Sequence, residues 1–147
     1  MRTIKFRGKT YDSKWVYGDL IHGVGNKHGR MYILPVTPIY PKGCDSLDGW
    51  DVIPETVGQL ICVIPNTSMY VDNSRELYED DIFISENRSA KYVAKYDDFG
   101  EYYGISNKGD KYGAFTTRLN RGNIDRLKVN IIGNIHDDPK LLTNYEK

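Results

Sequence analysis

The stretch Lys14-Trp-Val-Tyr-Gly-Asp-Leu20 decides the fold class, because apolar side chains stand at alternate positions in it. The stretch Thr3-Ile-Lys-Phe-Arg7 has the same period. Successive side chains of a strand point to opposite sides of the sheet, so a period of two is typical of a strand with one buried face. We therefore expect two half-buried strands near the start of the chain.

Four further stretches are expected to form strands. Leu60-Ile-Cys-Val-Ile64 is a short apolar run that Pro65 stops, whereas a core helix needs about ten residues or more. Residues 81–84, 91–96 and 128–132 are similarly rich in apolar and aromatic side chains. The whole chain holds 23 Ile and Val but only 3 Ala, which favours strand over helix.

Turn signals separate the expected strands. Glycine, asparagine, aspartate and proline cluster at residues 23–29, 41–43, 48–49, 72–74, 97–100, 107–109 and 121–123. Short strands separated in this way predict an all-β fold, mainly antiparallel, in the form of a small barrel or a sandwich. We expect residues 1–147 to form a single domain, because no linker or repeat divides them.

Two segments depart from this pattern. Asp138 precedes Pro139 and an apolar pair, which predicts a short C-terminal helix with a side-chain cap and proline at its first position. Residues 35–54 carry four prolines, and proline removes a hydrogen-bond donor from a strand ladder. We expect that segment to be a long irregular or functional loop.

Hydropathy and total charge limit the class of protein. No apolar stretch approaches the roughly 20 residues that cross a bilayer, and the first residues lack the apolar region of a signal peptide. We therefore expect a cytoplasmic protein with no membrane partner. Lys and Arg number 20, as do Asp and Glu, so no overall basicity favours nucleic acid.

The charges are distributed unevenly along the chain. Residues 1–30 hold seven Lys and Arg against two Asp and Glu, whereas residues 45–81 hold nine Asp and Glu against Arg75 alone. One hypothesis is that these segments pair between copies in a homo-oligomer. The alternative is two separate solvated faces. The candidate acidic interaction patch consists of Asp45, Asp48, Asp51, Glu79 and Asp80.

A basic strand with interleaved aromatics is the candidate binding face. Lys5 and Arg7 share one side of the expected strand and are predicted to form an exposed basic face. Basic grooves with exposed aromatics bind single-stranded nucleic acid in small β-barrels. The alternative is a solvated strand whose lysines protect an edge from aggregation. The candidate residues for binding nucleic acid or a partner protein are Lys5, Arg7, Lys9, Lys14 and Tyr11.

No residue pattern indicates catalysis. His22 and His28 flank a glycine-rich turn, but zinc sites need three or four ligands, so surface histidines are expected. Cys44 has no neighbouring cation or histidine to activate its thiol, and Cys62 is expected in the core. We therefore expect a protein that is not an enzyme and uses no cofactor or metal. The remaining alternative is an enzyme or small-ligand binder that uses Asp45, Asp48, Asp51 and His22.

Five blocks of sequence together resemble one family: Phe6-Arg-Gly-Lys9, Trp15-Val-Tyr-Gly18, Glu55-Thr-Val-Gly-Gln59, Leu77-Tyr-Glu-Asp-Asp-Ile82 and Ile132-Gly-Asn-Ile-His-Asp-Asp-Pro-Lys-Leu-Leu142. In order and spacing they are similar to the YopX family of small phage and prophage proteins, over nearly the whole chain. The resemblance implies a largely β, soluble protein and supplies no catalytic residues. Asp80 stands where the family usually has glycine. If that glycine has a positive φ, Asp80 is expected to adopt it.

The recurring residues of these blocks are expected to act in folding. Glycine lets a strand bend or another backbone approach, and Asp81 is placed to accept hydrogen bonds from the preceding turn. The two aromatics at 15 and 17 share one face of their strand and are expected to be core or barrel-mouth side chains. The residues expected to determine the fold are Trp15, Tyr17, Gly18, Gly58, Asp81 and Gly133.

These observations favour binding over catalysis. The leading hypothesis is an accessory protein of a phage or prophage in a bacterial host, which binds a host or phage protein and can self-associate. The alternative is a small β-barrel that binds nucleic acid through its basic N-terminal strand.

Overall fold

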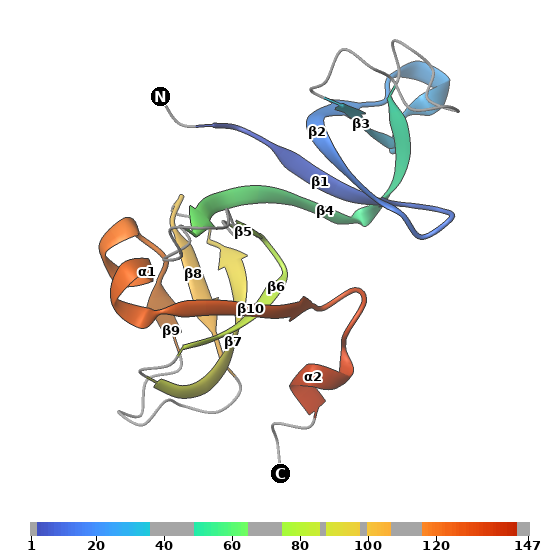
Figure 1. Ribbon diagram of the computed structural model, residues 1–147. Coiled ribbons are helices and arrows are strands. Elements are labelled where there is room, and N and C mark those ends of the chain that lie inside the picture. Colours follow the sequence, from blue (N-terminus) through green and yellow to red (C-terminus); the bar gives the residue numbers. More distant parts are fainter. Residues whose placement is uncertain are drawn as a thin grey trace, which may run out of the picture. The chain divides into compact units, whose positions relative to one another are not determined.

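The computed structural model describes residues 3–35, 49–64, 75–85, 88–97, 100–106 and 116–143 (Figure 1). The chain divides into two compact units, Met1–Leu60 and Ile61–Lys147. The boundary between them lies inside one strand, β4 (Trp50–Ile64), and no separate linker joins them. Each unit is described below by itself.

The first unit is a small closed barrel of four antiparallel strands: β1 (Phe6–Thr10), β2 (Trp15–His22), β3 (Met31–Pro35) and β4. Each strand pairs with the next, and β4 also pairs with β1, which closes the sheet on itself. The 3-10 helix η1 (Gly25–Lys27) lies in the connection between β2 and β3, where a turn is predicted. The expected barrel and the two expected N-terminal strands are confirmed.

The inside of this barrel is packed so closely that two strand positions need glycine. Ile33 and Val52 are fully buried. A Cβ atom on Gly8 would lie 2.9 Å from the Val52 side chain. A Cβ atom on Gly18 would lie 1.9 Å from the backbone oxygen of Leu34 on the neighbouring strand. The expectation that Gly18 admits another backbone is therefore confirmed.

Strand β4 accommodates a proline in a large bulge, in which residues 54–57 stand opposite Gly8 of β1. Its register against β1 jumps from Gly58, opposite Arg7, to Ile53, opposite Lys9. Pro54 lies within this bulge, where its missing N–H is not needed in the ladder. The predicted loop at 35–54 is thus wrong for residue 35, which ends β3, and for residues 50–54, which belong to β4, whereas residues 36–48 lie outside the described part of the chain.

Thr56 replaces the ladder inside the bulge with side-chain hydrogen bonds. Its Oγ1 accepts from the Lys9 N–H at 2.8 Å and donates to the Ile53 carbonyl at 2.6 Å. The residue is buried, so neither backbone group has water as a ready substitute partner.

Thr56→Val is expected to lower the free energy of unfolding by about 1–2 kcal/mol, because it keeps the shape of the side chain and removes both hydrogen bonds. Urea unfolding followed by circular dichroism measures the change. Thr56→Ser keeps the hydroxyl and is the matched control. Equal stabilities for the Val and Ser variants would show that the hydroxyl does not hold the bulge.

The second unit is an open antiparallel sheet with two helices. Its strands follow the hydrogen-bonded order β10-β6-β7-β8-β9, and β5 is the hydrogen-bonded neighbour of β4. The elements are β5 (Arg75–Tyr78), β6 (Asp81–Ser85), β7 (Arg88–Tyr96), β8 (Tyr102–Ile105), β9 (Thr116–Arg118), α1 (Arg121–Leu127), β10 (Val129–Asn134) and α2 (Lys140–Thr143). The strands predicted within β6, β7 and β10 are confirmed.

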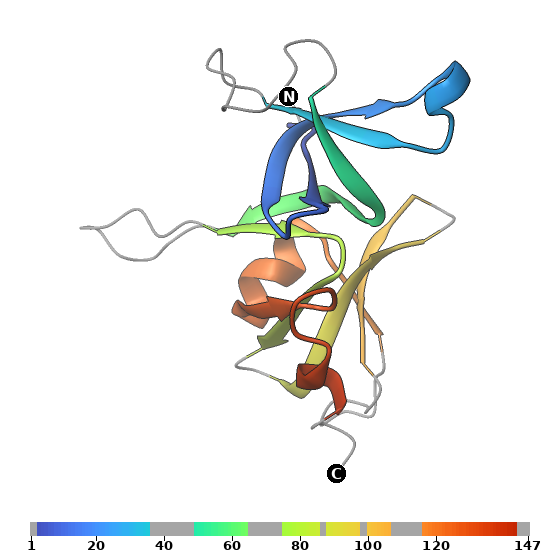
Figure 2. The same ribbon diagram turned by 90° about the vertical axis from the view of Figure 1, so that its right-hand side faces the viewer.

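The core of this unit lies between the sheet and helix α1 (Figure 2). Phe83 and Tyr92 are fully buried, and their rings are stacked with centroids 5.3 Å apart. Ile124 and Leu127 of α1 belong to the same buried cluster. Because these large side chains come from β6, β7 and α1, the core ties the middle of the sheet to the helix.

The turn that the sequence predicts at residues 121–123 is wrong, because these residues form the start of helix α1. The Asn120 side chain accepts a hydrogen bond from the Asn123 N–H at 2.9 Å, which is the usual cap of a helix start. Lys128 ends the helix in the left-handed conformation, with φ 50°. The Gly-Asn pair is thus tolerated in the first turn of a capped helix.

Helix α2 confirms the short C-terminal helix, although the predicted side-chain cap is different. The Asp138 carboxylate accepts from the Asn134 N–H at 3.4 Å, whereas the Asp138 backbone carbonyl accepts from the Leu141 N–H. Asp138 thus closes the turn that leads out of β10. The turns predicted at 41–43, 72–74 and 107–109 lie outside the described residues. Within the described part, no helix is long and apolar enough to cross a membrane.

Candidate functional site

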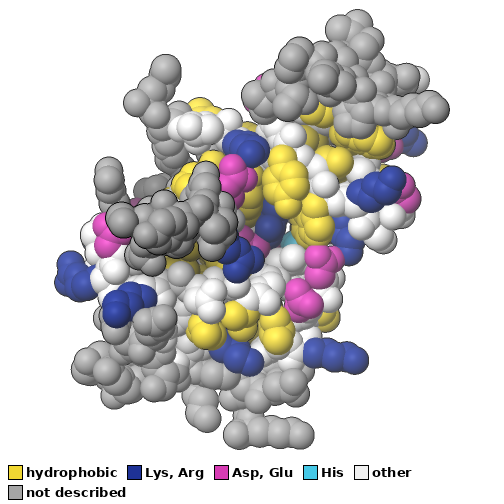
Figure 3. Space-filling model, in the orientation of Figure 1, with side chains coloured by type: hydrophobic (Ala, Val, Ile, Leu, Met, Phe, Trp, Pro, Cys, Tyr) yellow, Lys and Arg dark blue, Asp and Glu magenta, His cyan; other side chains and the backbone are white. Residues whose placement is uncertain are grey.

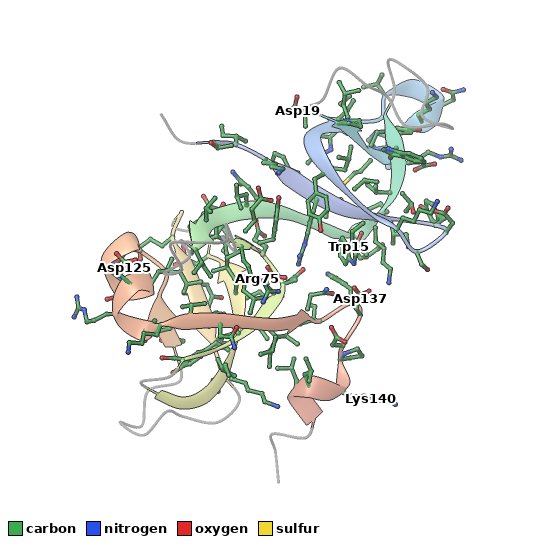
Figure 4. The ribbon with its side chains drawn as sticks, viewed as in Figure 1. Trp15, Asp19, Arg75, Asp125, Asp137 and Lys140 are labelled. Carbon is green, nitrogen blue, oxygen red and sulfur yellow. The ribbon has the colours of Figure 1, made fainter. Side chains whose placement is uncertain are left out.

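The β1–β2 hairpin brings the predicted basic residues and two aromatic rings together. Lys5 Nζ lies 5.7 Å from the centre of the Tyr17 ring. Above the Trp15 ring, the Arg7 guanidinium carbon lies at 4.7 Å and Lys9 Nζ at 6.0 Å. Trp15 is the first residue of β2 and is labelled in Figure 4. We call these five residues the hairpin face; their arrangement is a set of cation–π contacts.

Burial corrects one expectation about the hairpin face and narrows a second. Arg7 is only 6% exposed, so the predicted exposed basic face does not include it; its guanidinium covers the Trp15 ring instead. Tyr17 is 43% exposed and Trp15 is half-buried, so of the two expected places, core or barrel mouth, the core is excluded and the barrel mouth stays a prediction. Lys5 and Lys9 are half-buried.

Large apolar side chains are exposed around the same hairpin. Ile4 is 63% exposed and Tyr11, in the turn between the two strands, is 66% exposed. Lys14, on the other side of that turn, has a side chain 71% exposed and lies 3.7 Å from the Asp12 carboxylate. The hairpin therefore presents both apolar and positively charged groups to solvent.

The residues of the predicted acidic patch come from different parts of the fold. Asp45 and Asp48 lie outside the described residues. The Asp51 carboxylate lies 3.6 Å from the Arg30 guanidinium, so one residue of the acidic segment pairs with one of the basic segment inside the same unit. Glu79 and Asp80 belong to a turn of the second unit. Asp51 belongs to the first unit and these two carboxylates to the second. The acidic patch and the pairing between copies both stay predictions.

Asp80 is the centre of a polar cluster. Its Oδ1 lies 2.5 Å from Lys95 Nζ, and its Oδ2 lies 3.1 Å from His136 Nε2. Its backbone N–H donates to the Ala94 carbonyl, and its carbonyl accepts from the Ile135 N–H. One residue therefore joins the turn before β6, strand β7 and the turn after β10.

The backbone at Asp80 confirms the expectation drawn from the family glycine, because its φ is 71°. The partners of its side chain were missed by the sequence analysis. Lys95 is 15 residues away and His136 is 56 residues away, and no local pattern links them to Asp80. Only the pairing of β6 with β7 and β10 brings the three together.

Asp80→Ala is expected to be less stable than Asp80→Gly by about 1 kcal/mol, because both variants lose the charged pairs but only glycine adopts this φ without strain. The Lys95 pair is partly exposed and contributes little by itself. Urea unfolding of the two variants measures the difference. Equal midpoints and slopes would mean that the turn relaxes out of the left-handed region.

Asp81 confirms its predicted role. Its Oδ2 accepts a hydrogen bond from the buried Tyr78 N–H at 2.8 Å, and the residue is 3% exposed. Gly133 also has a close neighbour, because a Cβ atom there would lie 2.5 Å from the Asp138 carboxylate. Gly58 pairs with Arg7 in the β1–β4 register, and its role as a bend stays a prediction.

The histidines and cysteines form no metal site in the described residues, which contain no group of three or more candidate ligands. His22 ends β2 and His28 follows η1, and both are exposed. Cys44 is outside the described residues. Cys62 packs against the core of the second unit, as expected, and burial, with a smaller effect of Asp125, raises its pKa to about 11.

Cys62 is expected to react slowly with iodoacetamide in the folded protein. A pKa of about 11 instead of 9.0 leaves about 100-fold less thiolate at pH 8. The alkylation rate is measured by mass spectrometry in a Cys44→Ser variant, with and without urea. The rate is expected to rise with pH towards 11 and to increase greatly on unfolding; equal rates in the two states would contradict the burial of this thiol.

Comparison with other proteins gives one significant match. Neither curated proteins nor solved structures give a match. A family profile described as YopX protein matches residues 5–143. This range contains all five blocks and covers both compact units except for the first four and the last four residues of the chain. The match confirms the resemblance drawn from the sequence: the chain belongs to the YopX protein family.

Proposed function

We propose that this phage-type protein of the YopX family is a non-enzymatic domain that binds another protein of the phage or of its bacterial host through the β1–β2 hairpin, in the cytoplasm. The observation that carries the proposal is the concentration of exposed apolar side chains beside lysines on one hairpin. Ile4, Tyr11 and Tyr17 are all among the exposed large hydrophobic residues of the described chain.

Protein is a better fit than nucleic acid for two reasons. The cations Arg7 and Lys9 lie over the Trp15 ring, so that ring is not a ready platform on which a base stacks. On the face shown in Figure 3, Lys and Arg of the described residues stand singly among hydrophobic and other side chains and form no continuous basic stripe. Exposed tyrosines bordered by charge are typical of protein interfaces.

The partner expected from this chemistry is acidic. Residues 3–22 carry four Lys and Arg against two Asp, so the hairpin attracts a negatively charged surface. The closed barrel leaves β1 paired on both sides, with β2 and β4. A partner therefore binds to the side chains of this strand and does not add a strand beside it.

The proposal is tested by affinity capture of the tagged protein from host cells, with and without nuclease, followed by mass spectrometry. The double variant Lys5→Glu/Lys9→Glu reverses two charges of the hairpin face and is expected to lose the partner. The matched control, Arg126→Glu/Lys140→Glu, makes the same change of charge at two exposed positions of the second unit and is expected to retain it. Circular dichroism verifies that both variants are folded.

A nuclease-resistant protein that is lost with the hairpin variant alone supports the proposal. A partner retained by both variants, or an eluate with only the bait, contradicts it. A second copy of the chain as partner is detected by light scattering of the same purified protein.

Nucleic acid binding is the second candidate, since Lys5 and Lys9 lie on the same face as the exposed Tyr17. Fluorescence anisotropy with single-stranded and duplex oligonucleotides over a salt series tests it. Phosphate contacts predict an affinity that falls steeply with salt. No binding at low salt ends this alternative.

A further inference from the structure

We infer that the turn between β1 and β2 is a preformed anchor, which inserts the Tyr11 side chain into an apolar pocket with an acidic rim on the partner protein. The inference rests on the proposed function, namely that this hairpin binds a protein. It goes beyond that function by assigning the central residue of the interface and the chemistry of the surface that receives it.

The backbone of the turn is fixed by hydrogen bonds that do not involve the Tyr11 side chain. The Thr10 N–H donates to the Lys14 carbonyl at 2.8 Å, and the Ser13 N–H donates to the Thr10 carbonyl at 3.0 Å. Ser13 has a φ of 71°, which lets the chain reverse within three residues. The turn thus has a defined shape before any partner arrives.

The Thr10 side chain holds the turn from inside. Thr10 is 3% exposed, and its hydroxyl accepts from the Lys14 N–H at 3.0 Å and donates to the Asp12 carboxylate. This hydrogen bond is the main reason why the pKa of Asp12 lies below its ordinary value, and the Lys14 charge adds to it. Thr10 and Asp12, the residues on either side of Tyr11, are thereby held together.

Tyr11 differs from the other exposed tyrosines in its lack of polar and ring contacts within the described part of the chain. Its ring takes part in no hydrogen bond, ion pair or ring contact there, and the residue is 66% exposed. Tyr17 and Tyr96, which are also exposed, differ because each has a ring contact: Tyr17 with Lys5, and Tyr96 with Tyr102 at 4.7 Å. No polar or ring contact within the described part of the chain accounts for a large aromatic side chain at position 11.

A rigid turn makes an exposed tyrosine an efficient anchor. Binding usually costs the entropy of ordering a loop, and a turn that is already ordered avoids most of this cost. Tyrosine buries a large ring while losing few rotamers and is common among the residues that dominate interfaces. The pocket expected from this side chain is apolar, with an acceptor for the phenol hydroxyl.

The charge beside Tyr11 specifies the rim of the pocket. Lys14 is exposed, and Lys9 of the hairpin face is two residues before Tyr11. The only acid in the turn is Asp12, whose carboxylate accepts from the Thr10 hydroxyl and lies 3.7 Å from Lys14 Nζ, so Lys9 leaves the region with an excess of positive charge. A rim of carboxylates on the partner therefore complements the turn, and a basic rim does not.

The inference is tested first by photo-crosslinking in host cells. The benzophenone amino acid p-benzoylphenylalanine replaces Tyr11 in one variant and Val24, which is 79% exposed in the same unit, in the control. We expect a crosslinked protein from position 11 and none from position 24. Crosslinks from position 24 alone, or from neither position, overturn the inference, as does a crosslink from position 11 to nucleic acid or lipid.

The partner protein that the crosslink identifies is then purified in its free form. Its affinity for variants of the full chain is measured by calorimetry. Tyr11→Ala is expected to weaken binding by about 30-fold or more, with an unchanged unfolding midpoint. Lys14→Glu is expected to weaken binding and to reduce its salt dependence. Thr10→Val keeps Tyr11 but releases the turn, and is expected to weaken binding by about fivefold.

Two results separate this inference from the proposed function. If Lys5→Glu/Lys9→Glu abolishes binding and Tyr11→Ala leaves it unchanged, the hairpin binds a protein but Tyr11 is not its anchor. If neither variant changes the affinity, the hairpin is not the interface, and both the proposed function and the anchor are wrong.

Discussion

Gly18→Ala is expected to destabilise the first unit by about 3 kcal/mol. The added Cβ atom would lie 1.9 Å from the Leu34 backbone oxygen and 2.7 Å from its carbonyl carbon. Gly18 is paired with Phe6 on one side and Pro35 on the other, so its strand is held between β1 and β3. Relief of the clash requires these strands to separate and to lose ladder hydrogen bonds.

Gly133→Ala is the matched control for this prediction. Its Cβ atom would meet the Asp138 carboxylate at 2.5 Å and a Leu141 methyl at 2.9 Å, and both are ends of side chains that can rotate away. The expected cost is about 1 kcal/mol. Urea unfolding followed by Trp fluorescence measures the cost of Gly18→Ala, because Trp15 and Trp50 both lie in the first unit. Far-ultraviolet circular dichroism measures the cost of Gly133→Ala in the second unit. Equal costs for the two substitutions would mean that β3 moves easily.

Phe83→Ala is expected to lower the free energy of unfolding by about 3–5 kcal/mol. Phe83 is fully buried and stacked on Tyr92, so the truncation leaves a cavity where the sheet and α1 meet. Phe83→Leu keeps most of the volume and is expected to cost less than about 1.5 kcal/mol. Urea unfolding followed by far-ultraviolet circular dichroism measures both changes, and a small cost for the alanine variant would show that the core collapses onto the cavity.

Gly104 supplies a second test of the same packing. A Cβ atom at Gly104 would lie 2.7 Å from the Phe83 ring carbon Cζ, so Gly104→Ala is expected to destabilise the protein with phenylalanine at position 83. In the Phe83→Leu background that ring atom is absent, and Gly104→Ala is expected to cost less. A double-mutant cycle measures this coupling. Strict additivity would contradict the close contact.

The sequence predicted those strands that show either alternating side chains or a short run rich in apolar and aromatic residues. β1, β2, β6, β7 and β10 were found in this way, within a few residues of their ends. Most of β4 was missed because Pro54 breaks the pattern of strand residues. The strand accommodates Pro54 because the Lys9 N–H, which is distant in sequence, donates a hydrogen bond to Thr56 inside the bulge. β3, β5, β8 and β9 were missed: each has only three to five residues, and none was recognised from alternating side chains or an apolar run.

The site was predictable only where it depends on alternation within one strand or on a single backbone position. Lys5, Arg7 and Lys9 were correctly placed on one side of β1, and the positive φ of Asp80 followed from the family glycine. The burial of Arg7 was not predictable, because it depends on the ring that the partner strand places beneath its guanidinium. The His136 partner of Asp80 likewise depends on where β10 ends.

Strand β4 has a consequence for how this gene can change by recombination. Domains joined by a loop can be exchanged as cassettes, because a breakpoint in the loop leaves each core whole. Here the boundary between Leu60 and Ile61 lies within a fifteen-residue strand. A crossover at that point joins two half-strands from different parents, and a shift of one residue turns every later side chain to the opposite face. We therefore expect viable natural chimaeras to exchange the two units together, or to break in the segments on either side of β4.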